Sequence, residues 1–182
     1  LLGITELDDG LVELSVEPDM IPSRRPRGAV NDEYNAIYVY GRAVGETMFY
    51  GPGAGELPTA SAVVADLVTV VKNLKLGING RCAVPPYRPK RLKSDEQIEL
   101  KQFLRVIAED KAGVLARMTQ ILARHDVSLE RILQRPLEKG TSEIVIVTHK
   151  APKKALDAVV GELENLEVIR EIRSRYRVEG GN

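Results

Sequence analysis

The order of hydrophobic patterns in residues 99–178 constrains the fold of this chain more than any other feature. Apolar side chains alternate in "LKQFLRVIAED", which predicts a strand with one face formed by Leu100, Gln102, Leu104, Val106 and Ala108. The runs "GVLARMTQILARHD" and "PKKALDAVVGELENL" instead have apolar residues at helical spacing. Three further runs, "VSLERILQ", "EIVIVTH" and "VIREIRSRYRVEG", are predicted strands. The order βαββαβ with right-handed crossovers predicts a four-stranded antiparallel sheet with both helices on one face, in the α+β class.

The N-terminal half has weaker patterns. Two apolar-alternating runs around the turn Asp8 to Gly10 predict a hairpin in 1–17, and 34–50 is a second candidate hairpin. Helical spacing of apolar residues predicts a helix from Pro58 to Leu74. Prolines, glycines and basic residues replace this periodicity in "LGINGRCAVPPYRPKRLKSDEQ". We therefore expect a segment 1–75, a linker 76–98 and a C-terminal domain 99–182.

Charge and cysteine content exclude several classes of protein. Lysine plus arginine and aspartate plus glutamate both total 26, so no net field attracts nucleic acid or an anionic membrane. Cys82 is the single cysteine, and with His125 and His149 alone it excludes an internal disulfide and a typical zinc cluster. Charges interrupt the apolar runs short of the ~20 residues of a membrane span. A cytoplasmic location is the default expectation, and the start "LLGITELDDG" suggests a piece of a longer protein.

A run of glycines between a predicted strand and a predicted helix is the first candidate site. Gly51, Gly53 and Gly55 precede Glu56, and glycine lets a backbone approach a ligand beside a helix N-terminus. The spacing G-x-G-x-G differs from the dinucleotide fingerprint G-x-G-x-x-G, and no second parallel strand follows the helix. A plain strand-to-helix corner and a loop touching a ligand held by another domain both remain open.

The second candidate is the stretch "AEDKAGVLARM", where the first C-terminal strand meets its helix. Gly113 permits a tight turn there, and the helix N-terminus can receive a small carboxylate or polar ligand. The alternative is that Asp110 only caps the helix.

A third candidate is a row of arginines on the last strand. Alternation places Arg173, Arg175 and Arg177 on one face. A basic sheet face on a βαββαβ fold makes RNA binding a hypothesis to consider, because a known RNA-binding module has this topology. Phe103 and Tyr176 are the only aromatic residues available for base stacking, and the net charge is zero. Solvated charge or an interface to a partner sheet is therefore the favoured reading.

Two segments resemble known families. "VNDEYNAIYVYGRAVGETMFYGPGAGELPTASAVVADLV" resembles the C-terminal end of the catalytic region of homoserine dehydrogenase. "LRVIAEDKAGVLARMTQILARHDVSLERILQ", continued by "EIVIVTHKA", resembles an ACT domain, a ferredoxin-like βαββαβ module that senses small molecules. The resemblance implies an incomplete catalytic-region segment followed by an ACT domain. It also implies an enzyme that interconverts L-homoserine and L-aspartate 4-semialdehyde with NAD(P), on the pathway to threonine and methionine.

The first resemblance implies that Gly51, Gly53, Gly55 and Glu56 lie beside the NAD(P) cofactor of the intact enzyme. The nucleotide-binding domain and the catalytic lysine of the family are not in this sequence. We therefore expect this segment alone to be inactive and to hold no cofactor of its own.

The second resemblance implies feedback sensing of an amino acid, threonine being the usual effector. Asp110, Gly113, Val114 and Leu115 would line the site, with Ile132 and Gln134 closing it; Ala112 replaces the proline common in the loop. Edge-to-edge pairing of sheets implies a homodimer or a higher oligomer. The alternative function is a stand-alone amino-acid-sensing or dimerisation module without enzymatic activity.

Overall fold

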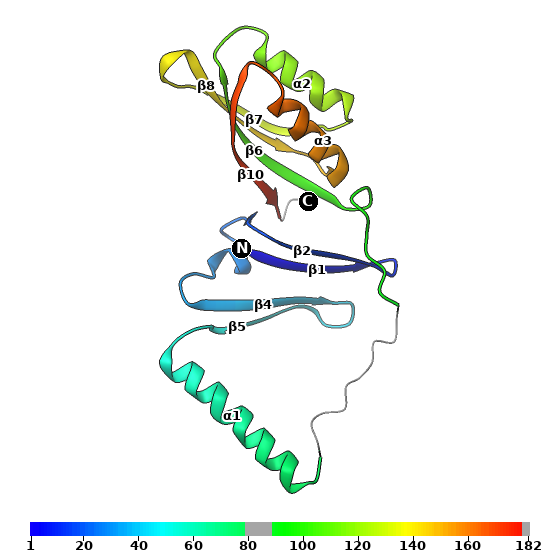
Figure 1. The fold of residues 1–182 in the computed structure, drawn as a ribbon, viewed down its shortest axis with the longest axis vertical. Helices are drawn as coiled ribbons and strands as arrows, with labels where there is room; N and C mark the ends of the chain where they lie inside the picture. The colour runs from blue at the N-terminus through cyan, green and yellow to red at the C-terminus, as the bar shows by residue number, and fades with distance from the viewer. Residues whose placement is uncertain (79–88, 180–182) are drawn as a thin grey trace. The chain divides into compact units, whose positions relative to one another are not determined.

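The computed structural model describes residues 1–78 and 89–179, whose course is drawn in Figure 1. The chain forms two compact units, one made of Leu1–Ile21 with Lys90–Asn182 and the other of Pro22–Pro89. Cys82 and part of the expected linker 76–98 lie outside the described residues.

The C-terminal part of the first unit has the predicted order of elements. It consists of β6 (Glu99–Glu109), α2 (Val114–Arg124), β7 (Leu129–Pro136), β8 (Thr141–Thr148), α3 (Lys153–Glu164) and β10 (Ile169–Val178). The strands lie in the order β10-β6-β8-β7 and are antiparallel to their neighbours. The short strand β9 (Ala151–Pro152) pairs with the start of β6, and a 3-10 turn, η2 (Glu138–Gly140), joins β7 to β8. The predicted ferredoxin-like α+β fold is confirmed.

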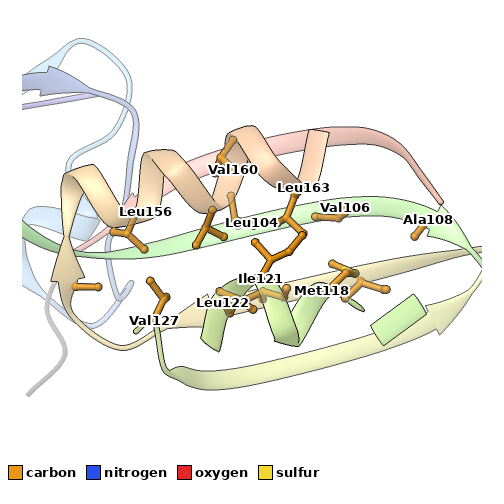
Figure 2. Packing of buried hydrophobic residues seen from close by; sticks show 14 of the residues in the cluster. Leu104, Val106, Ala108, Met118, Ile121, Leu122, Val127, Leu156, Val160 and Leu163 are labelled. Atoms are coloured by element: carbon orange, nitrogen blue, oxygen red, sulfur yellow. The ribbon is translucent and has the colours of Figure 1, made fainter. Parts of the chain in front are cut away.

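A single hydrophobic core lies between this sheet and its two helices (Figure 2). The predicted inner face of β6 is buried throughout, including the polar Gln102. The helices contribute the apolar residues that their spacing predicted, among them Met118 and Leu122 from α2 and Leu156 and Leu163 from α3. Removal of these side chains from water is the main stabilising contribution to the domain.

The N-terminal hairpin belongs to the same compact unit. It pairs β1 (Leu2–Asp8) with β2 (Leu11–Glu17) through a two-residue turn. Asp9 and Gly10 both have positive φ, 45° and 77°, as a tight turn matched to the twist of the strands requires. The predicted hairpin is therefore present.

The chain after this hairpin extends the C-terminal sheet. The strand β3 (Asp19–Met20) pairs in parallel with the end of β10 and becomes an edge of the sheet. The division into a segment 1–75, a linker 76–98 and a C-terminal domain 99–182 stays a prediction. By contact, residues 1–21 pack with the C-terminal half of the chain.

The second unit contains the other predicted hairpin and the predicted first helix. A 3-10 turn, η1 (Pro26–Ala29), precedes the antiparallel pair β4 (Tyr34–Gly41) and β5 (Gly45–Pro52), and α1 (Glu56–Lys75) follows. The helix starts two residues before the predicted Pro58. None of its residues is buried within the described part of the chain, and Leu57 is 81% exposed.

Among the described residues, α1 is the one helix long and apolar enough to cross a membrane, judged by length and composition alone. A single such helix is weak evidence for a span, and Asp66 lies within it. The expectation of no membrane span stays a prediction.

Candidate functional site

The loop between β6 and α2 is the best-formed candidate site. Gly113 is the residue before the helix and has φ +86°, a conformation that favours glycine. Within the described part of the chain no side chain caps α2. The N–H of Val114 donates to the carbonyl of Lys111 at 3.4 Å, whereas those of Leu115 and Ala116 keep free hydrogen-bonding capacity there. Asp110 instead donates its backbone N–H to the carbonyl of Gly140 at 2.9 Å. The cap position of α2 is Gly113, and the hydrogen bond that the Asp110 carboxylate accepts comes from Gln134, so the alternative in which Asp110 caps the helix is wrong.

The carboxylate of Asp110 faces Gln134 on β7, across the intervening strand β8. Gln134 Nε2 donates to Asp110 Oδ1 at 3.3 Å and lies 3.4 Å from the hydroxyl of Ser142 on β8. Two predicted site residues from different elements are thus brought together. Sequence reasoning missed Ser142, which is fully buried, because the predicted strand "EIVIVTH" begins one residue after it.

The other predicted effector residues have different surroundings. Val114 is buried in the core and can offer a ligand only its backbone. Leu115 is partly buried against the same core. Ile132 is 42% exposed and lies two residues from Gln134, on the same face of the edge strand β7.

Charged side chains surround the start of this loop. Glu109 pairs with Lys111 at 2.8 Å and with Arg170. The hydrogen bond from Lys111 holds the pKa of Glu109 below its ordinary value. The loop therefore presents helix N–H donors for a carboxylate and the Asp110 carboxylate for an ammonium group. This is the pair of contacts that an amino acid requires.

The glycine run forms a corner between β5 and α1. A side chain at Gly53 would place its Cβ 2.0 Å from Asn35 Nδ2, so the exposed side chain of Asn35 would have to move to make room for it. Gly53 also donates its N–H to the carbonyl of Glu33 at 2.7 Å. Gly55 precedes α1 with φ +123°, and its carbonyl accepts from the Thr59 hydroxyl at 2.7 Å. The positive φ of Gly55 is thus explained by the corner itself.

This corner is a poor cradle for phosphate. Pro58 occupies the third position of α1 and has no N–H, while the carboxylate of Glu56 lies in the first turn. Gly51 has open space where a side chain would stand, and Glu56 can accept a hydrogen bond from a hydroxyl. The geometry fits a loop beside a ligand rather than the main holder of a dinucleotide.

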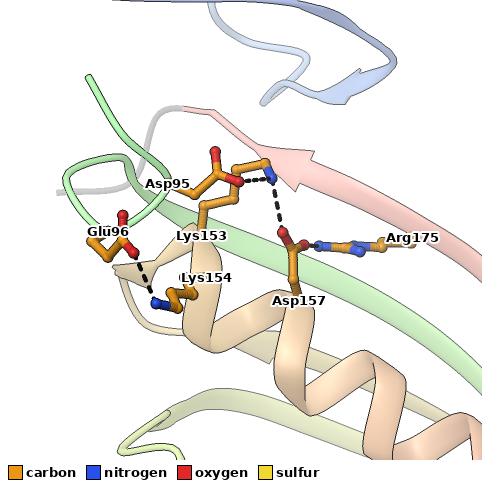
Figure 3. A network of polar contacts seen from close by, with 6 residues as sticks. All are labelled: Asp95, Glu96, Lys153, Lys154, Asp157 and Arg175. Carbon is orange, nitrogen blue, oxygen red and sulfur yellow. Dashed lines mark hydrogen bonds and ion pairs between the residues drawn. The ribbon is translucent and has the colours of Figure 1, made fainter. Parts of the chain in front are cut away.

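The expected basic face of β10 does not form. A register shift between Ile172 and Ser174 takes Arg173 out of the alternation, while Arg175 and Arg177 lie opposite Leu104 and Gln102 on the helix side. Each arginine pairs with carboxylates: Arg173 with Glu171, Arg175 with Asp157, and Arg177 with Glu13 and Glu179. Figure 3 shows the Arg175–Asp157 pair within a network that ties α3 to the segment before β6. The RNA-binding alternative loses its basis.

Comparisons with known proteins identify both parts of the chain. The family model of homoserine dehydrogenase matches residues 1–68, and the ACT-domain model matches residues 103–168. The chain joins a homoserine dehydrogenase segment to an ACT domain. Both resemblances drawn from the sequence are thereby confirmed.

Relatives of this homoserine dehydrogenase segment and its ACT domain cover nearly the whole chain. The homoserine dehydrogenase of Bacillus subtilis is 47% identical over 99% of this chain and 42% of its own length. That of Pseudomonas aeruginosa is 37% identical over 98% of this chain and 43% of its own. A crystal structure of a homoserine dehydrogenase from Thiobacillus denitrificans superposes with a TM-score of 0.79, at 34% identity, over 97% of this chain and 41% of that chain. The chain therefore spans less than half the length of these relatives.

Proposed function

We propose that this chain is the C-terminal part of an NAD(P)-dependent homoserine dehydrogenase whose ACT domain binds threonine as a feedback effector. The enzyme interconverts L-homoserine and L-aspartate 4-semialdehyde in threonine and methionine biosynthesis, in the cytoplasm. The observation that carries the regulatory part is the contact of Gln134 with Asp110 beside the uncapped start of α2.

Threonine matches the groups gathered at this loop. Its carboxylate accepts hydrogen bonds from the first backbone N–H groups of α2, where the helix dipole favours negative charge. Its ammonium group pairs with the carboxylate of Asp110. Its hydroxyl bonds to the amide of Gln134, and its methyl group contacts Ile132. This assignment gives each functional group of the effector a partner of complementary chemistry.

The edge strand β7 supports self-association of the ACT domain. All its residues except Leu129 are exposed, and its outer edge is unpaired within the described sheet. Such an edge is a template for pairing with another chain. We propose that β7 pairs with β7 of a second copy, giving a homodimer or a higher oligomer with two effector loops near the shared edge.

The glycine corner is proposed to lie beside NAD(P) in the intact enzyme. Gly51, Gly53, Gly55 and Glu56 would contact the cofactor, whose phosphates another domain holds. The bound cofactor supplies the hydride chemistry, and this chain contributes the shape of the corner and the Glu56 carboxylate. Because the nucleotide domain and the catalytic lysine belong to the remaining part of the family sequence, we expect this segment alone to be inactive and to bind no cofactor.

Membership of a longer enzyme also accounts for the exposed apolar side chains of α1. Relatives have more than twice the length of this chain, so the remaining part of the enzyme is available to cover them. The alternative, a stand-alone amino-acid sensor or dimerisation module, leaves this exposed helix unexplained.

Calorimetric titration of the 182-residue chain with L-threonine tests the effector site. We expect saturable binding that Asp110→Ala weakens by about tenfold or more, the loss expected for a charge-assisted contact. Glu164→Ala removes an exposed carboxylate at the end of α3 and serves as the control, with unchanged affinity. Methionine, isoleucine, lysine and serine are the competing ligands. Absence of heat with all five amino acids would overturn the effector assignment.

A further inference from the structure

A buried ion pair joins the N-terminal hairpin to the last strand of the ACT sheet. Arg177 Nη1 donates to Glu13 Oε1 at 2.6 Å, and the two side chains are 7% and 3% exposed. Arg177 Nε also donates to Glu179 at 2.7 Å. Lys93 lies 3.9 Å from the other oxygen of Glu13. The guanidinium is thus held between carboxylates from opposite ends of the chain.

Backbone hydrogen bonds hold the hairpin at the same place. The parallel pairing of β3 with β10 sets Asp19 opposite Arg177, and Glu179 donates its N–H to the carbonyl of Met20 at 2.9 Å. Val12 exchanges two backbone hydrogen bonds with the segment before β6, at 2.8 and 2.9 Å. The hairpin lies in the homoserine dehydrogenase segment and β10 belongs to the ACT sheet, so the two modules meet here.

The opposite end of β10 touches the effector loop. Glu109 donates its N–H to the carbonyl of Val168 at 2.9 Å, and its carboxylate pairs with Arg170. Asp110, the next residue, faces Gln134 at the proposed effector site. Two register shifts interrupt the pairing of β10 with β6 between these ends. One strand therefore connects the effector loop with the hairpin, and its pairing is irregular along the way.

We propose that β10 couples the effector loop to the N-terminal hairpin, taken here as Leu1–Ile21. The Glu13–Arg177 pair is the contact, called the latch below, through which β10 holds or releases this hairpin. The inference rests on the proposed effector site at Asp110. Separating this buried pair leaves Arg177 with Glu179 alone and Glu13 with the longer Lys93 contact, and we expect docking of the hairpin to be two-state rather than graded. Both carboxylate oxygens of Asp19 are buried beside this pair and have no hydrogen-bond partner among the described residues, which lowers the cost of release.

Hydrogen exchange measured by mass spectrometry on the full chain tests the latch without any ligand. Arg177→Met should speed exchange of the amides in residues 11–21 by about tenfold or more, because the buried Glu13 loses its hydrogen-bonded partner and keeps only the longer contact with Lys93. Glu13→Gln, which keeps a hydrogen-bond acceptor, should give a smaller increase and guards against a variant that fails to fold. Arg173→Met on the same strand is the matched control, since its pair with Glu171 is exposed.

Two outcomes of this experiment would overturn the latch. One is unchanged exchange of residues 11–21 in Arg177→Met. The other is equal acceleration throughout β6 and β8, which would mean that the pair stabilises the whole domain rather than the docking of the hairpin.

Threonine then tests the coupling. In the unmodified chain, saturating threonine should change exchange in residues 11–21 by about fivefold, and by reciprocity Arg177→Met should change the threonine Kd by a similar factor. Threonine binding without either change would overturn the coupling and leave the effector site standing. If threonine does not bind, Arg170→Met perturbs the loop end of β10 directly. Unaltered exchange of the hairpin in that variant would refute the coupling independently of the effector.

Discussion

Thr148 closes the ladder between the two central strands of the ACT sheet. Regular pairing of β6 with β8 ends at Phe103 and Val147, and the next backbone amide, that of Gln102, donates to the Thr148 hydroxyl at 3.0 Å. Thr148 is 0% and Gln102 4% exposed. Replacing the hydroxyl by a methyl group in Thr148→Val keeps the shape of the side chain and removes the acceptor. Because water cannot reach the amide, it is left without a partner.

The cost follows from this burial. A buried unsatisfied N–H destabilises by about 1–3 kcal/mol, against a total stability of about 5–15 kcal/mol for a typical domain. The matched variant Thr148→Ser keeps the acceptor and removes one methyl group, which costs about 1 kcal/mol. We therefore expect the valine variant to be the less stable of the two, although it retains more apolar volume.

Urea unfolding followed by circular dichroism measures both variants. The expected result is a lower midpoint at an unchanged m-value, with the larger shift for Thr148→Val. Hydrogen exchange of the Gln102 amide gives a local readout, which should accelerate in the valine variant and stay slow in the serine variant. A valine variant as stable as the original chain, with the Gln102 amide still protected, would refute the reasoning.

Three further predictions concern packing, backbone conformation and pH. Leu104→Ala in the fully buried core should cost about 2–5 kcal/mol by urea unfolding, whereas Val44→Ala, 74% exposed, should change stability by less than about 0.5 kcal/mol. Gly161→Ala inside α3 meets open space and should stabilise by about 0.5–1 kcal/mol, while Gly113→Ala at φ +86° should destabilise by about 1 kcal/mol; thermal unfolding compares them. Burial raises the pKa of Asp19 from 3.8 to about 6, so the docked hairpin favours its protonated form. Hairpin protection in hydrogen exchange should therefore fall as pH rises from about 4 to about 6, and Asp19→Asn should remove that slope.

The arginines of β10 show where sequence reasoning failed. Strict alternation predicted one basic face. The register shift before Ser174 breaks the alternation, so Arg173 no longer shares a face with Arg175 and Arg177. Because side chains alternate with a period of two, a shift of one residue changes the face on which each side chain lies. A bulge depends on pairing with β6, and the pattern within β10 alone contains no signal for it.

The candidate effector site was only partly predictable, because part of it depends on how the strands pair. Gly113 and the start of α2 follow from local pattern, and resemblance indicated Asp110 and Gln134. Ser142 was missed, because its role depends on the registration of β8 against β7 rather than on its neighbours in the chain.

The sequence by itself determined the local elements: the βαββαβ order, the inner face of β6, the apolar faces of α2 and α3, and the tight turn at Asp9 and Gly10. These depend on periodicity and backbone preference over a few residues. Only the tertiary structure decided that Glu13 meets Arg177, 164 residues away, and that β3 extends the sheet at β10. Such partnerships depend on which edges remain unpaired once the core has formed, and on where bulges turn a charged side chain inward.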